Sequence, residues 1–328
     1  MLKDKFGRVH DYLRISLTER CNLRCTYCMP ADGIELRPKS HFMTQHEVFA
    51  IASEFVRHGV KKIRLTGGEP LVRKDAREII EALAGLPVEL AITTNGILVD
   101  EFIDTFKTAG INAINVSLDS LQKAKFNQIT RRDYFDRIIA NINLLLHSGF
   151  HVKLNAVLIK GVNDDELIDF IELTKHQKLH YRFIEFMPFN GNSWNWEKGL
   201  SYKEIMTQIG ARYGSRIERL ADAKNDTAKN FRISDYKGTF AVITSVTNPF
   251  CDSCNRIRLT ADGKLKNCLF SGTETDLLSA FRRGEYIEQL ILDSIWDKKA
   301  QRGGLNSFDQ FSNALYHNQN RAMVAIGG

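Results

Sequence analysis

Strand-like and helix-like patterns alternate through the first 187 residues of the chain. Six stretches alternate polar and apolar side chains as strands do: 12–18, 61–66, 88–94, 111–118, 151–159 and 180–187. Amphipathic helical patterns lie between most of them, at 44–59, 74–85, 100–110, 134–149 and 164–177. This repeated strand–helix order predicts a parallel sheet with right-handed crossovers, either as an open sheet or as a barrel.

One face of the predicted strands is polar, whereas parallel strands covered by helices are usually apolar on both faces. The period of two brings these side chains to one face: Arg14, Ser16, Lys62, Arg64, Thr66, Asn115, Ser117, Lys153 and Asn155. A closed eight-stranded barrel is filled with apolar side chains, so six strands with a polar row favour an α/β fold with an incomplete (βα)6 TIM-like barrel around a polar, anionic ligand. An antiparallel sheet with one wet face is the less favoured alternative, because helical patterns intervene nearly every time.

The character of the sequence changes after Met187. Residues 189–199 and 220–230 are rich in Asn, Gly and Lys, which indicates loops. A strand pattern at 238–246, a hairpin with Asp262–Gly263 at its turn and two helical patterns near 275–298 follow. We therefore expect residues 1–230 to form the barrel and residues 231–328 to form a smaller α+β C-terminal domain.

Charge and hydropathy exclude several classes of protein. Lys and Arg exceed Asp and Glu by 45 to 39, an excess that suits an anionic ligand but is too small and scattered to predict nucleic-acid binding. Neither a signal-peptide core nor a run of 18 apolar residues occurs, so we expect a cytoplasmic protein without membrane contact. In that reducing compartment, clustered cysteines indicate metal binding or catalysis rather than disulfides.

The six cysteines form two triplets, C-x3-C-x2-C at Cys21, Cys25 and Cys28 and C-x2-C-x13-C at Cys251, Cys254 and Cys268. A 4Fe-4S cluster takes one thiolate per iron, so each triplet would leave one iron open to a small molecule. Zinc is the rival, and the second triplet alone would favour it, but structural zinc takes four ligands. His10 lies too far upstream of the first triplet, and His317 lies far from the second.

The first triplet, directly after the first predicted strand, resembles that of the radical S-adenosylmethionine (SAM) enzymes. The motif LTGGEP at 65–70 also matches this family. The resemblance implies that Tyr27 lies against the adenine of SAM and that Gly68 meets its methionine amino group. Two glycines at the end of a strand let the backbone approach a ligand closely.

The second triplet, in which Arg256, Ile257 and Arg258 follow the C-x2-C pair, resembles that of the GTP 3′,8-cyclases that open molybdenum-cofactor biosynthesis. This resemblance runs across nearly the whole chain, except for the region 189–232. It rests on the motifs TTNG (93–96), INVSLD (114–119), RFIEFMPF (182–189), ITSV (243–246) and the terminal IGG (326–328). It implies two 4Fe-4S clusters.

The resemblance also implies a role for individual residues. Ser117 and Met187 would contact SAM beside Tyr27 and Gly68, and the tail Gly327–Gly328 would enter the active site. GTP would be held by Arg14, Arg64, Thr93, Lys153, Arg256, Ile257 and Arg258. Without the resemblance, we would interpret Arg256 and Arg258 as a solvated edge-strand pair and the tail as disordered.

The implied reaction is the conversion of GTP to (8S)-3′,8-cyclo-7,8-dihydroguanosine 5′-triphosphate. An external electron donor would reduce the first cluster, which would cleave SAM to a 5′-deoxyadenosyl radical. This radical would take hydrogen from C3′ of GTP, and C3′ would then attack C8 of the guanine held by the second cluster. The product would pass to cyclic pyranopterin monophosphate synthase. A radical SAM peptide-modifying enzyme, which would usually bring more C-terminal cysteines, and a zinc or RNA-binding module are the alternatives.

Overall fold

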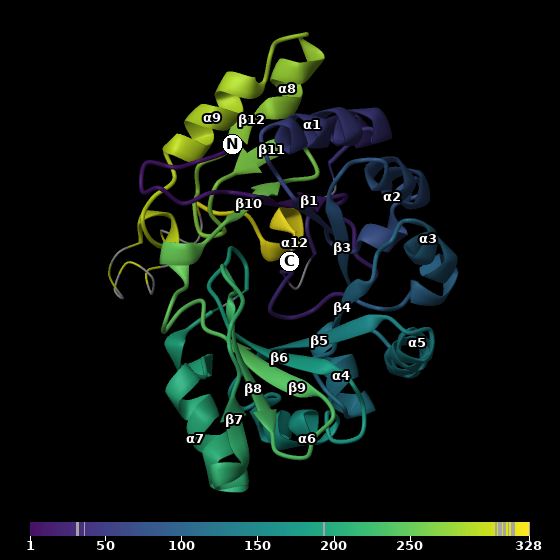
Figure 1. The fold of residues 1–328 in the computed structure, drawn as a ribbon, viewed down its shortest axis with the longest axis vertical. Coiled ribbons are helices and arrows are strands. Elements are labelled where there is room, and N and C mark those ends of the chain that lie inside the picture. The colour runs from purple at the N-terminus through teal and green to yellow at the C-terminus, as the bar shows by residue number, and fades with distance from the viewer. Residues whose placement is uncertain are drawn as a thin grey trace.

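The computed structural model describes residues 1–30, 33–35, 37–192, 194–305, 307, 310, 313, 315 and 319–327. The described strands form one twelve-stranded sheet in the order β12-β11-β10-β1-β2-β3-β4-β5-β6-β9-β8-β7 (Figure 1). Their bounds are β1 (Tyr12–Ser16), β2 (Lys62–Thr66), β3 (Glu89–Thr94), β4 (Ala113–Ser117), β5 (His151–Leu158), β6 (His180–Glu185), β7 (Ile217–Arg219), β8 (Ala228–Ile233), β9 (Thr239–Ile243), β10 (Arg256–Leu259), β11 (Lys264–Lys266) and β12 (Thr275–Asp276).

The centre of the sheet is parallel. The six predicted strands, β1 to β6, pair in sequence order and in parallel, which confirms the predicted partial barrel. The sheet then continues at both ends with strands from later in the chain, because β10 pairs in parallel with β1 and β9 pairs in parallel with β6. The expected domain boundary at residue 230 falls inside β8, so the division into two domains stays a prediction.

Helices cover the outer side of the parallel strands, while the C-terminus lies near the middle of the curved sheet (Figure 1). Helix α1 begins with a capping box between Thr44 and Glu47, and it buries Val48, Ile51 and Phe55 at helical spacing against the sheet. The helix bounds are α1 (Gln45–Arg57), α2 (Ala76–Ala84), α3 (Ile103–Thr108), α4 (Lys123–Thr130), α5 (Phe135–His147), α6 (Leu167–Glu172), α7 (Tyr202–Tyr213), α8 (Leu277–Arg282), α9 (Glu288–Trp296) and α12 (Met323–Ile326).

Several parts of the fold differ from the sequence prediction. Residues 228–230 were predicted as loop but belong to β8, because their backbone pairs with β9, where Asn230 lies opposite Ala241. Helix α7 was not predicted, although Ser201 and Glu204 form a capping box at its start, a pattern visible in the sequence.

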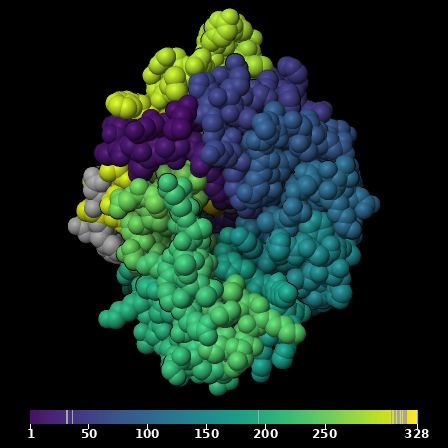
Figure 2. Space-filling model, viewed as in Figure 1, coloured from purple at the N-terminus to yellow at the C-terminus, as the bar shows by residue number. Residues whose placement is uncertain are grey.

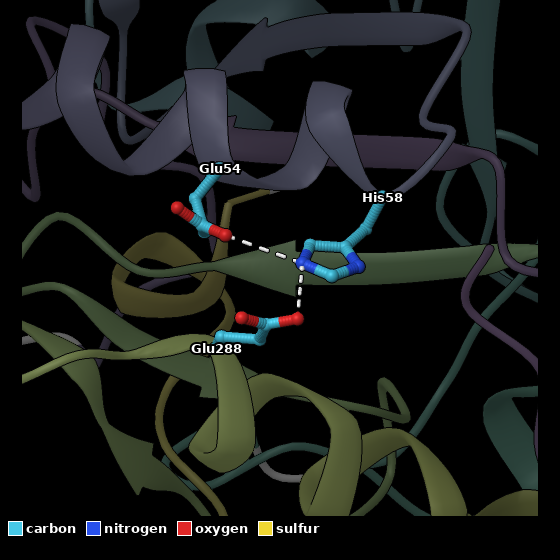
Figure 3. Close-up of side chains that lie close together, drawn as sticks. All are labelled: Glu54, His58 and Glu288. Carbon is cyan, nitrogen blue, oxygen red and sulfur yellow. Dashed lines mark hydrogen bonds and ion pairs between the residues drawn. The ribbon is translucent and has the colours of Figure 1, made fainter.

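Helices α8 and α9 pack beside α1, whereas α12 lies inside the curved sheet (Figure 1). His58 at the end of α1 lies between Glu54 of the same helix and Glu288 of α9 (Figure 3). Its Nε2 lies 3.2 Å from Oε1 of Glu54 and 3.3 Å from Oε1 of Glu288. The contact between His58 and Glu288 joins α1 of the barrel to α9 of the C-terminal region.

Candidate active site

The first cysteine triad lies on the loop that follows β1. The backbone of this loop hydrogen-bonds to the end of α4, where Arg24 N donates to Thr130 O at 2.9 Å and Thr26 N donates to Ile129 O at 2.9 Å. Within the loop, Cys28 N donates to Cys25 O at 3.0 Å. Helix α4, which has no counterpart among the predicted helices, therefore supports the loop that carries the triad.

The two glycines of the LTGGEP motif pack against the same loop. A Cβ atom on Gly68 would collide with the carbonyl oxygen of Arg20, and a Cβ on Gly67 would lie 2.7 Å from the carbonyl oxygen of Thr18. Gly68 N donates to Thr18 O at 2.6 Å. The glycines thus allow a close approach to the backbone that leads into Cys21, a reason for glycine beyond the expected approach to a ligand.

A single cavity brings the first triad together with most of the expected cofactor contacts. It is lined by residues of the loop, of the carboxyl ends of the parallel strands and of α12, among them Cys21, Cys25, Cys28, Tyr27, Gly68, Thr93, Ser117, Met187 and Met323. Ligand sites in parallel sheets form at the carboxyl ends of the strands. The individual roles of these residues stay predictions.

Two buried carboxyl groups near the first triad were not among the predicted site residues: Asp119 lines the cavity, and Glu69 is bonded to two residues that line it, Thr94 and Asn95. Glu69 accepts hydrogen bonds from Thr94 Oγ1 at 2.8 Å and from Asn95 N at 2.6 Å, and burial raises its pKa to about 7. Asp119 accepts from Tyr27 Oη at 2.7 Å, and burial raises its pKa to about 6. Both stand in quoted motifs, LTGGEP and INVSLD, so the sequence did contain a signal for them.

These carboxyl groups shape the electrostatics of the first triad. Burial, with the charge of Glu69 added to it, raises the pKa of Cys21 to about 11. Burial and Asp119 raise the pKa of Cys25 as well. The free thiols are therefore protonated near neutral pH, so metal binding here must release protons.

A row of cations lines the face of the sheet next to this cavity. Arg14 is in register with Arg258 on one side and with Arg64 on the other. Lys153 lies in register with Asn115, and Asn115 with Thr93, so the predicted polar residues share one face of the sheet, with Ala91 of β3 opposite Arg64. Paired residues in a ladder share a face, and the same face carries three residues that were not predicted: Tyr12, His180 and Arg182.

The cations are crowded enough to perturb one another. Burial, with the repulsion of Arg256, lowers the pKa of Arg258 to about 10, and burial, with the repulsion of Arg64, lowers that of Arg182 to about 10. Burial raises the pKa of Tyr12, but the charges of Arg64 and Arg14 lower it more, to about 7. Buried like charges with perturbed pKa values indicate a site for an anion.

Ile257 does not belong to this row. Its side chain is fully buried in the hydrophobic core, and its register partner in β1 is Leu13. Its predicted contact with GTP would therefore have to come from the backbone. Arg256 and Arg258, two positions apart on β10, share the inward face as expected.

The second cysteine triad lies beside β10 and β11 in cationic surroundings. Lys298 Nζ lies 3.6 Å from Cys254 Sγ, and Arg302 N lies 3.5 Å from Cys251 Sγ. Burial raises the pKa of Cys254, but Lys298 and Arg256 lower it more, so the net shift is downward. The charged groups next to the two triads therefore differ in sign, carboxyl groups near the first and cations near Cys254 of the second, although burial still raises the pKa of Cys251.

The C-terminal tail enters the sheet interior between the two triads. Gly327 O accepts a hydrogen bond from Arg258 Nη1 at 2.5 Å, and a Cβ on Gly327 would collide with Thr66 Oγ1. Upstream, Arg321 pairs with Asp262 at 2.8 Å and with Glu274 at 2.5 Å. The predicted approach of the tail to the site agrees with the position of Gly327, whereas Gly328 lies outside the described residues.

The donor sets fit iron–sulfur clusters better than single metal ions. All six cysteines are free thiols, three in each triad. Among the described residues, Glu54, His58 and Glu288 form the one group of three potential metal ligands whose donor atoms all lie within 4.8 Å of one another. In neither triad do the three sulfur atoms lie close enough together to bind one zinc ion, whose bonds to sulfur are about 2.3 Å long.

Comparison with known proteins agrees with this arrangement. The model of the radical SAM superfamily matches residues 15–174, and that of Molybdenum Cofactor Synthesis C matches residues 179–303. The mitochondrial GTP 3′,8-cyclase of Arabidopsis thaliana is 47% identical over 335 residues, which cover 100% of this chain and 84% of that protein. Molybdenum cofactor biosynthesis protein 1 of Mus musculus is 44% identical over 332 residues, covering 99% of this chain.

The chain spans 51% of the mouse protein, so it corresponds to about half of that longer relative. Among solved structures, Streptococcus suis SuiB matches with a TM-score of 0.63 and 18% identity, covering 92% of this chain and 69% of SuiB, a likeness in fold alone. The radical SAM superfamily implies a 4Fe-4S cluster and SAM. The chain belongs to the radical SAM superfamily and, within it, to the family of the GTP 3′,8-cyclases.

Proposed function

We propose that this protein converts GTP to (8S)-3′,8-cyclo-7,8-dihydroguanosine 5′-triphosphate, the first step of molybdenum-cofactor biosynthesis. One 4Fe-4S cluster would be held by each cysteine triad. The observation that carries the proposal is the cavity of the first triad next to a buried row of cations, with Gly327 between Thr66 and Arg258. This arrangement would place the radical-generating cofactor beside the polyanionic substrate.

At the first triad, the cluster and SAM together supply the radical that abstracts hydrogen from the substrate. The residues of the chain bind and orient SAM. The ligand would carry a cationic sulfonium and an amino group. The buried carboxyl group of Asp119 lines the cavity, and that of Glu69 lies behind the lining residues Thr94 and Asn95, to which it is bonded. Tyr27, whose hydroxyl is fixed by Asp119, would present its ring to the adenine. Charge complementarity therefore supports this end of the cavity as the SAM site.

Along the sheet, the cations would hold the triphosphate. Burying several phosphate charges requires several cations nearby, and Arg14, Arg64, Lys153, Arg256 and Arg258 supply five. Arg256 and Arg258 face the same way on β10, and planar guanidinium groups suit the paired oxygens of phosphate. Binding would also relieve the repulsion that lowers the pKa of Arg258.

At the second triad, the open iron of the cluster would bind the guanine base. The tail would close the space between the two ends, since Val324, Ala325 and Ile326 are buried beside Gly327. Excluding water protects a reactive radical from side reactions. A glycine tip fits because a larger side chain would collide with Thr66.

The reaction needs two partners that the chain does not provide. We propose an external one-electron donor and, downstream, cyclic pyranopterin monophosphate synthase, both met in the cytoplasm. Among the described residues, none of the helices has the length and apolarity needed to span a membrane.

Anaerobic reconstitution tests the proposal. The protein with iron and sulfide, supplied with SAM, GTP and dithionite, should release 5′-deoxyadenosine and a cyclised nucleotide, whereas ATP in place of GTP should give no cyclised product. Failure to form deoxyadenosine would reject the radical reaction. Deoxyadenosine without a cyclised nucleotide would reject GTP as the substrate.

A further inference from the structure

The segment before β1, which contains Asp4, Arg8 and His10, packs against the part of the chain that carries the second cysteine triad. Figure 2 shows this purple segment between yellow and green segments from the C-terminal part of the chain. Arg8 Nη1 donates to Cys251 O and to Ala300 O, each at 2.8 Å, and Nη2 donates to Lys299 O at 2.8 Å. Residues that precede the barrel therefore help to build the surroundings of a triad about 240 positions away.

A buried polar chain runs from this segment to the triad. Asp4, His10 and Lys298 are 1%, 0% and 2% exposed. Asp4 Oδ2 lies 3.1 Å from His10 Nε2, and His10 Nδ1 lies 3.4 Å from Lys298 Nζ. Burial and the charge of Lys298 lower the pKa of His10 to about 4, so the ring is neutral near pH 7. A neutral ring that donates from Nε2 to Asp4 must accept at Nδ1, which faces the ammonium group.

Lys298 completes the chain at the sulfur of Cys254. Its Nζ donates to Arg256 O at 2.8 Å and lies 3.6 Å from Cys254 Sγ. Of its contacts with the carbonyl, the imidazole and the sulfur, only the sulfur becomes anionic, once the thiol has released its proton to bind metal. A buried ammonium requires such a partner, because burying an unpaired charge is costly. The carboxylate of Asp4 is already paired with Arg8, whose Nε lies 2.6 Å from Oδ2.

We propose that Lys298, oriented by His10 and Asp4, is a positioning residue that donates a charged hydrogen bond to the Cys254 thiolate and raises the reduction potential of the second cluster. The inference rests on the proposed presence of that cluster. Reduction adds a negative charge to a cluster, and a cation or a hydrogen bond at a ligand sulfur stabilises the reduced form.

The first triad offers an internal comparison. The hydrogen bonds to Cys21 Sγ come from neutral groups, Leu23 N at 3.4 Å and Asn95 Nδ2 at 3.8 Å. The described surroundings of that triad include two acidic residues: Asp119, which lines the same cavity, and Glu69, which accepts a hydrogen bond from Asn95 N. Removing the charge of Lys298 should therefore shift one cluster and leave the other unchanged.

A potentiometric titration followed by electron paramagnetic resonance tests the proposal on the full chain with both clusters reconstituted. Lys298→Met should move the potential of the second cluster to a more negative value and leave that of the first unchanged. Lys298→Arg keeps the charge, so the potential of its second cluster should stay nearer to the wild-type value. Lys299→Met is the matched control, because Lys299 is the exposed neighbour and its side chain is screened by solvent.

His10→Gln gives a second, independent test, because it keeps Lys298 but removes the imidazole that orients it. It should shift the second potential in the same direction by a smaller amount. If Lys298→Met prevents the second cluster from assembling, the His10→Gln titration decides, and a potential equal to that of the wild type overturns the inference. A wild-type chain with only about four irons would instead overturn the proposed function.

Discussion

The two cysteine triads offer the same number of thiols next to charged groups of opposite sign. The first shares its cavity with the carboxyl group of Asp119, and burial together with the nearby charge of Glu69 raises the pKa of Cys21. The second lies beside the cations Lys298 and Arg256, which lower the pKa of Cys254. The first environment suits a cationic ligand such as a sulfonium, and the second suits an anionic one. The comparison teaches that ligand count alone does not assign a role, whereas the charge around the thiols separates two roles.

Serine substitutions should separate the two triads most sharply. Cys25→Ser should abolish both 5′-deoxyadenosine and the cyclised nucleotide, because SAM could no longer be cleaved. Cys254→Ser should abolish only the cyclised nucleotide, because the first triad remains intact. Chromatography of both products checks the expectation. Equal loss of deoxyadenosine in both variants would show that the triads do not act separately.

GTP binding at the row of cations should be sensitive to the loss of one guanidinium group. Arg258→Ala should weaken GTP binding by about 1–3 kcal/mol, which is roughly 5- to 150-fold, because it removes a charge-assisted contact from a buried site. Calorimetry of GTP binding measures the change. The control is Arg282→Ala, since Arg282 pairs with Glu47 on the outer surface. An unchanged affinity for GTP would remove Arg258 from the substrate site.

The tail between the triads should depend on the ion pairs of Arg321. Arg321→Gln leaves Asp262 and Glu274 without this partner, so the tail would lose part of its anchor. We expect the rate of cyclisation to fall about tenfold while SAM cleavage persists. This loss is smaller than the roughly hundredfold loss of rate caused by misplacing a reacting group by about 1 Å. Arg283→Gln, which removes an exposed pair with Glu285, is the control. A parallel fall in both products would contradict a role confined to the tail.

The smallest expected effect is a pH dependence at the cation row. The pKa of Tyr12 is lowered to about 7, so its phenol is neutral below that pH and anionic above it. A phenolate repels the triphosphate, so GTP affinity should fall as pH rises through about 7, by at most tenfold per unit. Tyr12→Phe should flatten this part of the profile measured by calorimetry from pH 6 to 8.5. The same slope in wild type and variant would exclude Tyr12 as its source.

Much of the barrel was predictable because its signal is local. A period of two identified β1 to β6, and the same period placed Arg14, Arg64 and Lys153 on one face, as the register of the sheet confirms. The addition of β9 and β10 to opposite ends of these strands was not predictable, because strand pairing between distant segments leaves no periodic trace in either one.

The surroundings of the second triad were the least predictable part of the site. His10 was considered only as a ligand for the first triplet and was judged too distant. It lies instead on a buried path to Cys254 through Lys298, residues separated from it by 244 and 288 positions. Such contacts depend on how the chain folds back on itself, and neither His10 nor Lys298 stands in a recognisable motif.

Iron analysis with anaerobic spectroscopy tests the central claim most directly. The claim is that each triad holds its own cluster. The account predicts about eight irons in the wild-type chain and about four when either triad is replaced by alanine. A wild-type chain with about four irons, or one with zinc at Cys251, Cys254 and Cys268, would contradict it.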